Sequence, residues 1–455
     1  MNECHPSATE LRRLTDAGLC AVAPDGAVLR HLHLDGGRLT LTDRDGNPAW
    51  SGDLDACRRV RVLGAGKGAA PMAAALENLL GDRITDGLVV VKYGHGLPEG
   101  VLRRIRVREG GHPVPDEAGA VAAGEIVDMA KDCGPDDLVL CVFTGGASAL
   151  TPALHPDVPL ADMRRFTGLL LECGATIHEI NTLRKHLSRF SGGNLAHAAF
   201  PATVLGLIVS DVVGDDLDVI ASGPTVPDPA TFADCLRVVE RYDLRWRMPP
   251  SIWTHLEKGL QGLAPETPKA GDPAFGRTDN VLIASVQQAL DAAADEARAC
   301  GFAPRILTTV MSGEARERAV ELVEEARHVQ TTLRPGDAPV CLLAGGETTV
   351  TIRGRGKGGR NQEMALAATL ALADDRGIDL VCVGTDGTDG PTDAAGGYAF
   401  SGDLARLRAL GLRPKACLDD NDSYPLLLKA GTLLRTGPTR TNVMDMAILL
   451  VRPKA

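Results

Sequence analysis

The sequence predicts an α/β fold made of two domains. A chain of 455 residues is too long for one compact core. Short β-branched runs lead repeatedly into a glycine-rich turn and then an Ala/Leu-rich stretch, the pattern of strands that alternate with helices. Aromatic residues make up only 3% of the chain, so the cores are built from Ala, Val and Leu, which favours buried strands and helices over a β-sandwich.

The strand–turn–helix pattern occurs along the whole chain. Continuous apolar runs of this kind are typical of the buried strands of a parallel sheet. The pattern is found at 59–80, 137–150, 203–216, 340–354 and 378–390.

The expected domain limits follow from a change in the sequence pattern after Trp246. From there to Asn280 the chain carries Pro and Gly without clear periodicity. We therefore expect an α/β domain with a parallel sheet over 1–246, a linker over 247–279 and a second α/β domain over 280–455. A cleft between the two domains is also expected.

Composition excludes several classes of protein. The net charge of −11 and the few aromatic residues argue against nucleic acid as a partner. Eleven cysteines stand singly, several in apolar runs (Cys141, Cys341, Cys382), which indicates reduced thiols and no zinc site. With no signal-peptide core and no apolar run near the ~18 residues of a membrane span, we expect a cytoplasmic protein without a membrane partner.

The turn Gly64-Ala65-Gly66-Lys67-Gly68 follows a strand and opens a helix. Such a turn aims backbone N–H groups at one spot and attracts phosphate or carboxylate, although many similar turns only pack a helix on its strand. It does not match the phosphate P-loop. The next strand ends in Lys92, where an acid would hold the ribose of NAD, so NAD is disfavoured and NADP stays open.

A second glycine loop, within 345–368, concentrates positive charge. Its cations are Arg353, Arg355, Lys357 and Arg360, and Asn361 then caps a helix. So much like charge at a helix N-terminus points to a polyanion such as a nucleoside triphosphate, with a solvated loop as the alternative.

Acidic loops follow two strands. Asp211 closes one strand, and Asp386 and Asp389 follow another. Ligands of open α/β sheets bind beyond the carboxyl ends of the strands, so these acids suit Mg²⁺ binding or proton transfer. No GxSxG elbow supports a hydrolase, and the basic loops, acidic strand ends and glycine turns together indicate phosphoryl transfer.

At its motifs the chain resembles the glycerate 2-kinase family, the two-domain type with a C-terminal MOFRL domain. The matching segments run in the family's order from about residue 60 to 450 and include GAGKGAAPMA, GGHPVPDEAG, INTLRKHLSRFSGGNLA, GGETTVTIRGRGKGGRNQE, GTDGTDGPTDAAGG and TGPTRTNVMD. The resemblance implies ATP- and Mg²⁺-dependent phosphorylation of D-glycerate at its 2-hydroxyl. It also implies a Rossmann-like N-terminal domain, a C-terminal α/β domain and an active site in the cleft between them. Carried over motif by motif, it implies that Lys67 and Arg360 are catalytic.

We assign the remaining roles as expectations. Asp211 is the proposed base, with Asp386 as its rival, and Asp386 with Asp389 are the candidate metal ligands. ATP or phosphate contacts are expected from Gly64, Gly66, Gly145, Gly146, Ser148, Lys357, Gly358 and Gly359. Substrate contacts are expected from Arg184, Lys185, Asn361 and Glu347.

Three positions depart from the family pattern: Ala147, Ser191 and Asn194. They bear on the hydroxy acid more than on the phosphoryl donor, so a kinase of a related small hydroxy acid is one alternative. An NAD(P)H-dependent hydroxypyruvate reductase and a non-catalytic sugar-acid sensor are the others. The motifs carry no signal for an oligomeric state.

Overall fold

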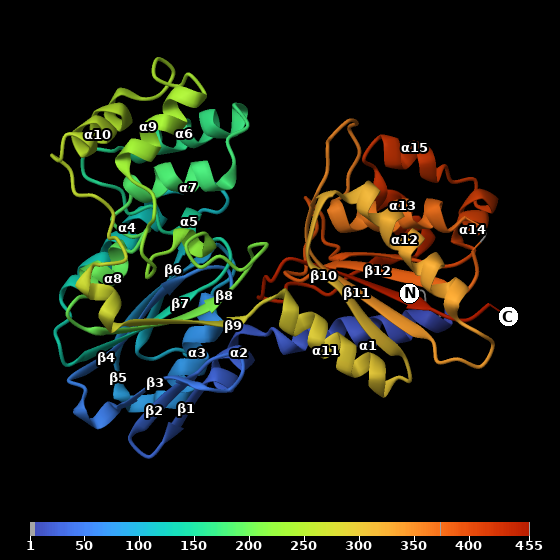
Figure 1. The fold of residues 1–455 in the computed structure, drawn as a ribbon, viewed down its shortest axis with the longest axis horizontal. Helices are drawn as coiled ribbons and strands as arrows, with labels where there is room; N and C mark the ends of the chain where they lie inside the picture. Colours follow the sequence, from blue (N-terminus) through green and yellow to red (C-terminus); the bar gives the residue numbers. More distant parts are fainter. Residues whose placement is uncertain (1–4, 374, 455) are drawn as a thin grey trace. The chain divides into compact units, whose positions relative to one another are not determined.

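The computed structural model describes residues 5–373 and 375–454, and the chain forms two compact units (Figure 1). The first unit comprises Pro24–Ser210 and Asp215–Ile283. The second unit comprises Met1–Ala23, Asp211–Gly214 and Ala284–Ala455.

The first unit is built on a six-stranded sheet with the order β6-β5-β4-β7-β8-β9. The neighbours from β6 to β8 pair in parallel, and β7 is buried along its whole length. Numbered along the chain, the order is 3-2-1-4-5-6, the doubly wound arrangement of a Rossmann-like fold, so the fold prediction is confirmed. The strands are β4 (Arg59–Ala65), β5 (Ile84–Lys92), β6 (Ile105–Gly110), β7 (Asp137–Phe143), β8 (Thr203–Val209) and β9 (Thr278–Ala284).

Helices and a small antiparallel sheet complete this unit. The helices that accompany the main sheet are α2 (Pro24–His31), α3 (Ala69–Leu80), α4 (Glu117–Lys131), α5 (Ala147–Leu150) and α8 (Asn194–Ala199), with short 3₁₀ turns η1 (Leu54–Ala56), η2 (Gly81–Arg83), η3 (Ile220–Ser222) and η4 (Pro273–Arg277). The small sheet contains β1 (Leu32–Asp35), β2 (Arg38–Thr42) and β3 (Pro48–Asp53).

Four further helices of the first unit pack around a core of their own, apart from the sheet (Figure 1). Phe166, Leu183, Phe232 and Ile252 are buried in this core, one from each helix. The helices are α6 (Leu160–Glu172), α7 (Ile177–His186), α9 (Phe232–Arg241) and α10 (Pro250–Leu260).

The second unit holds a mixed sheet with the order β10-β11-β15-β12-β13-β14. Only β10 and β11 pair in parallel, and the other neighbours are antiparallel. Its strands are β10 (Ala303–Glu314), β11 (Val340–Thr349), β12 (Ile378–Gly384), β13 (Gly396–Ala399), β14 (Leu433–Leu434) and β15 (Asp445–Val451). Its helices are α1 (Pro6–Ala21), α11 (Val286–Ala299), α12 (Ala315–Thr332), α13 (Arg360–Leu372), α14 (Asp403–Ala409), α15 (Pro414–Asp419) and α16 (Ser423–Ala430).

The two units divide the chain differently from the expected domain limits. Helix α1 joins the second unit because Leu11 and Leu14 are buried there and Ser7 Oγ donates a 2.5 Å hydrogen bond to Asp379 of β12. Within the segment expected to be a linker, α10 buries Ile252 and Leu256 in the first unit. The prolines before α10 mark the start of a helix there, not a flexible connection.

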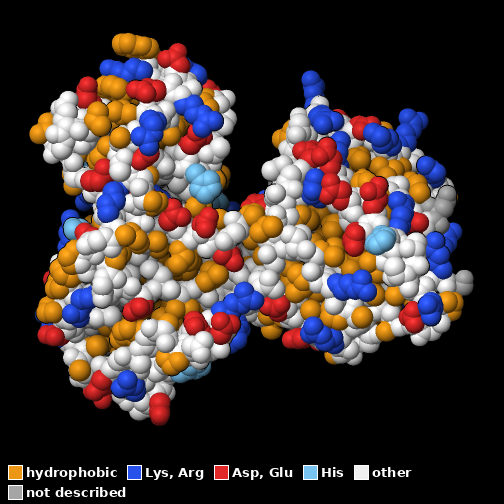
Figure 2. Space-filling model, viewed as in Figure 1, with side chains coloured by type: hydrophobic (Ala, Val, Ile, Leu, Met, Phe, Trp, Pro, Cys, Tyr) orange, Lys and Arg blue, Asp and Glu red, His pale blue; other side chains and the backbone are white. Residues whose placement is uncertain are grey.

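Charged side chains of both signs are mixed on the surface. Lys and Arg side chains are interspersed with Asp and Glu over the visible face of each unit (Figure 2).

The ten cysteines within the described residues are free thiols, and Cys141, Cys341 and Cys382 are buried, as their apolar neighbours predict. Within those same residues, no helix combines the length and the apolar character needed to cross a membrane.

A buried ion cluster fixes the start of β4 and β7. The side chain of Asp137 is fully buried, and its carboxylate accepts hydrogen bonds from Arg58 (2.7 and 3.0 Å), Arg59 (2.8 and 3.1 Å) and the N–H of Gly134 (2.8 Å). Burial alone would raise the pKa of Asp137, but the two guanidinium groups hold it well below its ordinary value. The cluster therefore stabilises the two central strands at neutral pH.

We expect Asp137→Asn to lower the free energy of unfolding at pH 7 by about 1.5–3 kcal/mol, the range for hydrogen bonds to a charged group. Because the folded-state pKa lies below the unfolded one, the contribution is present above about pH 4 and is lost as the pH falls further. Denaturant unfolding of parent and variant at pH 7 and pH 3 checks this. An equal difference at both pH values would show that charge plays no part.

Candidate active site

Two glycine loops meet at the point where the strand order of the first unit reverses. The loop after β4 contains Gly66 and Lys67, and the loop after the neighbouring β7 contains Thr144 and Gly145. Lys67 N–H donates to the carbonyl of Gly145 at 2.9 Å. Ligands of doubly wound sheets bind outside the carboxyl ends of the strands at such a reversal, so the predicted residues come together where a ligand is expected.

The two loops can approach this closely because glycines, which have no side chain, stand where they meet. A Cβ on Gly64 would lie 2.0 Å from the carbonyl oxygen of Val142, and one on Gly66 would lie 2.2 Å from Thr144 Oγ1. Gly66 also has φ +131°, and Gly146, just before α5, has φ +87°. The backbones of the two loops are therefore closely packed against each other: Gly64, Gly66 and Gly145 are buried, while Lys67 and Gly146 are partly exposed.

Helix α7 carries three basic residues with different surroundings. Lys185 is buried, and its Nζ donates to Asp218 at 3.0 Å and Asp228 at 3.4 Å, an internal ion pair. His186 is also buried, at 2.7 Å from Glu266 Oε1. Arg184 instead lines a cavity of about 370 Å³ that Ser148 also lines. Of the predicted substrate contacts on this helix, Arg184 thus faces open space and Lys185 does not.

In the second unit, Arg360 begins α13 and is held by two acids. Its Nε and Nη2 donate to Asp445 at 2.6 and 3.0 Å, and its Nη1 donates to Glu347 at 2.6 Å. Burial alone would lower the pKa of Arg360, but the two carboxylates raise it, so the guanidinium stays charged. Asp445 is fully buried, and that burial raises its pKa to about 6. Asn361 Nδ2 also donates to Asp445, at 2.9 Å, which places Arg360, Asn361 and Glu347 in one network.

The acids of the 386–393 loop cap backbone turns. Both oxygens of Asp389 accept N–H groups at the start of α13, from Asn361 at 3.1 Å and Gln362 at 2.9 Å, and burial raises its pKa. Asp386 Oδ1 accepts the N–H and hydroxyl of Thr388, each at 3.0 Å. Among the residues described, no three His, Cys, Asp or Glu side chains are placed to hold a metal together. Asp389 thus fits a metal ligand poorly, and a metal role for Asp386 stays a prediction.

The cationic loop before α13 is bound by a segment of the protein itself. The backbone N–H groups of Arg353 and Gly354 donate to Asn421 Oδ1 at 2.7 and 3.1 Å, and that of Lys357 donates to Asp422 at 2.9 Å. A Cβ on Gly358 would lie 2.1 Å from Ser423 Oγ, and one on Gly359 would lie 2.3 Å from Asp389 Cγ. The glycines therefore let the chain pack on itself. Phosphate binding by Lys357, Gly358 and Gly359 remains a prediction.

Asp211 follows β8 but belongs to the second compact unit. Asn442 Nδ2 lies 3.3 Å from Asp211 Oδ2, and Asn442 stands three residues before Asp445, the partner of Arg360. Since three residues of chain span at most roughly 11 Å, Asp211 lies in the neighbourhood of the Arg360 network.

Sequence reasoning missed three residues that hold the site together. Asp445 binds Arg360, Asn421 accepts hydrogen bonds from the cationic loop, and Ser222 hydrogen-bonds Ser148 at 2.8 Å. From the sequence alone, no role is assigned to any of these three residues. An acid at the start of the apolar run DMAILLV was the one available signal for Asp445.

The fold and the two glycine loops define a doubly wound α/β protein with a candidate ligand site at the reversal of strand order. Residues 10–257 match a family described as a domain of unknown function, DUF4147, and residues 340–445 match the MOFRL family. A glycerate 2-kinase of Pyrococcus horikoshii is 41% identical over 97% of each chain. A putative hydroxypyruvate reductase of Agrobacterium vitis is 40% identical over 97% of this chain and 94% of its own.

Solved structures agree with these sequence matches. The crystal structure of a glycerate kinase from Thermotoga maritima superimposes with a TM-score of 0.85 at 39% identity, over 98% of this chain and 100% of its own. The chain belongs to the glycerate kinase family, and the resemblance predicted from its motifs is confirmed.

We expect Gly66→Ala to destabilise the protein by about 3 kcal/mol or more. The positive φ costs about 1–2 kcal/mol, and the overlap with Thr144 adds about 1–3 kcal/mol. Gly81→Ala is the matched control, because Gly81 has φ +55° but open space around a Cβ. Denaturant unfolding of both variants measures the difference. Equal losses would mean that the approach of the two loops is not tight.

Proposed function

We propose that the protein transfers the γ-phosphoryl group of ATP to the 2-hydroxyl of D-glycerate, which yields 2-phosphoglycerate and ADP. The observation that carries the proposal is Lys67 on a tight glycine turn at the reversal of strand order, in a chain closely similar to a glycerate 2-kinase. A lysine side chain on a backbone turn that internal hydrogen bonds hold in place suits the charge of a transferring phosphoryl group.

Proton transfer is assigned to Asp211. The 2-hydroxyl oxygen bonds to the γ-phosphorus, the bond from that phosphorus to the β–γ bridging oxygen breaks, and ADP leaves with the electron pair. The hydroxyl proton passes to the Asp211 carboxylate, which Asn442 orients through its amide. Arg360, already fixed by Asp445, offers its remaining guanidinium edge to the carboxylate of glycerate or to the phosphoryl group.

We propose that Mg²⁺ enters with ATP. In phosphoryl transfer this ion is held mainly by phosphate oxygens and waters, with one or two carboxylates from the protein, and it neutralises phosphate charge. Asp386 is the candidate protein ligand. A shared cleft between domains, the choice between Asp211 and Asp386 as base, and a cytoplasmic location stay predictions.

The assay that tests the function has two arms. Purified protein is given D-glycerate with Mg-ATP, and separately hydroxypyruvate with NADPH. Glycerate-dependent release of ADP supports the kinase. Oxidation of NADPH without ADP release would support the reductase named for the Agrobacterium relative, and neither product would support a sensor. Other short 2-hydroxy acids in the first arm define the acceptor.

Lys67→Ala is expected to lower kcat about 10²–10³-fold, the effect of removing a preorganised charge from a developing anion. Steady-state kinetics with D-glycerate and Mg-ATP measure the loss. Lys131→Ala, at the end of α4, is the control for removal of a lysine. Turnover of Lys67→Ala within about threefold of the parent would leave Lys67 a packing residue.

Chelation is expected to abolish activity. Excess EDTA should stop glycerate-dependent ADP formation, and added Mg²⁺ or Mn²⁺ should restore it, since both ions accept oxygen ligands. Undiminished turnover in EDTA contradicts the metal requirement.

A further inference from the structure

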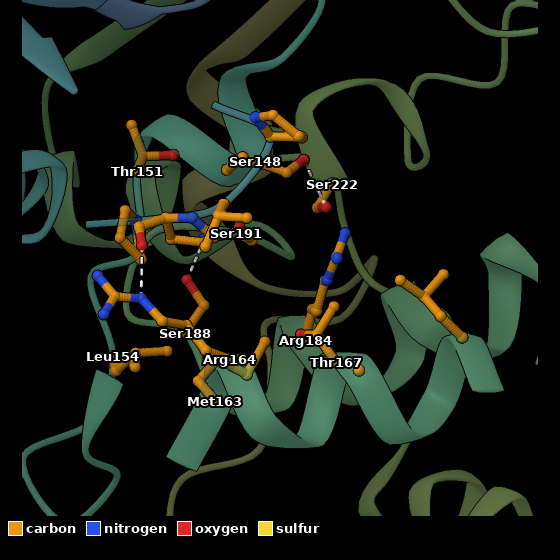
Figure 3. Close-up of a pocket in the computed structure, with 17 residues that line it drawn as sticks. Ser148, Thr151, Leu154, Met163, Arg164, Thr167, Arg184, Ser188, Ser191 and Ser222 are labelled. Carbon is orange, nitrogen blue, oxygen red and sulfur yellow. Dashed lines mark hydrogen bonds between the residues drawn. The ribbon is translucent and has the colours of Figure 1, made fainter. Parts of the chain in front are cut away.

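The cavity beside α7 lies wholly within the first unit and has a volume of about 370 Å³. It opens between α6, α7 and the segment that follows β7 (Figure 3). A volume of this size lies within the range of small-molecule pockets.

One end of the cavity is polar and carries an uncompensated charge. Ser148 and Ser222 hydrogen-bond each other at 2.8 Å, and Arg184 extends from α7 toward Ser222 (Figure 3). Within the described part of the chain, Arg184 has no hydrogen bond or ion pair, and burial lowers its pKa. Because a desolvated cation without a partner is costly, this end of the cavity suits an anionic group.

The rest of the lining is mixed. Besides hydroxyl side chains it includes Arg164, whose Nε donates to the carbonyl of Pro115 at 2.6 Å. The apolar part of the wall is formed by Val114, Pro152, Leu154, Met163 and Leu171. A three-carbon hydroxy acid is small and polar throughout, so it leaves this apolar part unused, whereas a flat heterocycle such as a purine base has apolar faces that can pack on it.

The polar end leads toward the glycine loops. Ser148 stands three residues after Gly145, whose carbonyl accepts the N–H of Lys67 at 2.9 Å. Three residues of chain span at most roughly 11 Å. A ligand with an apolar base at one end and a row of phosphates at the other can therefore reach from the apolar walls past Arg184 to the turn of Lys67.

We infer that this cavity holds the adenine and ribose of ATP, and that Arg184 and Ser148 face its phosphates. The inference rests on the proposed kinase function. It makes Arg184 a contact of ATP, the phosphoryl donor, whereas from the sequence alone we expect it to contact the acceptor glycerate. The apolar walls recognise the base, while the arginine supplies the charge that orients the phosphate chain toward Lys67.

Gly168→Leu is the primary test. Gly168 lies on α6, lines the cavity and has no atom within 4 Å of an added Cβ, so leucine fills the space without a clash at its first carbon. Gly124→Leu on α4 is the matched control, because Gly124 is also helical with open space but does not line the cavity. Calorimetric titration with ATP, with adenosine and with D-glycerate is run on each protein, and thermal unfolding confirms folding.

The expected result is that Gly168→Leu weakens ATP and adenosine about tenfold or more, with D-glycerate within twofold and Gly124→Leu like the parent. Unchanged ATP affinity overturns the inference. So does a loss confined to D-glycerate, which would make the cavity the acceptor site.

Arg184→Gln is a second variant, which keeps a long polar side chain but removes its charge. It is expected to weaken ATP about tenfold and to leave adenosine unchanged. A parent protein without glycerate-dependent turnover would reject the proposed function, while the ATP and adenosine titrations would still decide the cavity.

Discussion

The candidate site of the first unit depends on how closely two backbone loops approach at the reversal of its sheet. The hydrogen bond from Lys67 to Gly145 forms only because Gly64 and Gly66 have no side chains to strike Val142 and Thr144. The buried Asp137 cluster sets the opposite ends of the same two strands. The backbone of Lys67 is therefore held between strands fixed at both ends, which sets the point from which its side chain extends before a ligand arrives.

Positive charge is compensated differently in the two units. In the second unit Arg360 is paired with Asp445 and Glu347, and the loop before it is bound by Asn421 and Asp422. Arg184 in the first unit has no such partner among the residues described. The contrast separates Arg360, which acids hold in one orientation and leave with one free edge, from Arg184, whose whole guanidinium group is available to a ligand.

The sequence predicts the sheets well and the partners of charged residues poorly. Glycine turns after apolar runs are local signals, so the Rossmann-like sheet and the place of Lys67 could be inferred. The pairing of Arg360 with Asp445 joins residues 85 apart in the chain, and that of Arg353 with Asn421 joins residues 68 apart. The residues next to each partner in the sequence give no sign of such a pair. Asp389, a metal-ligand candidate in the sequence, accepts N–H groups at the start of α13 and so caps that helix.

The placement of α1 has a consequence for how the protein is made. Ser7 bonds to Asp379, 372 residues later, and α1 also packs on β15. Because synthesis runs from α1 toward these strands, the apolar face of α1 stays uncovered until β12 and β15 have been made. A nascent chain therefore exposes this face while the residues in between are added, which makes α1 a natural binding point for chaperones that hold nascent polypeptides.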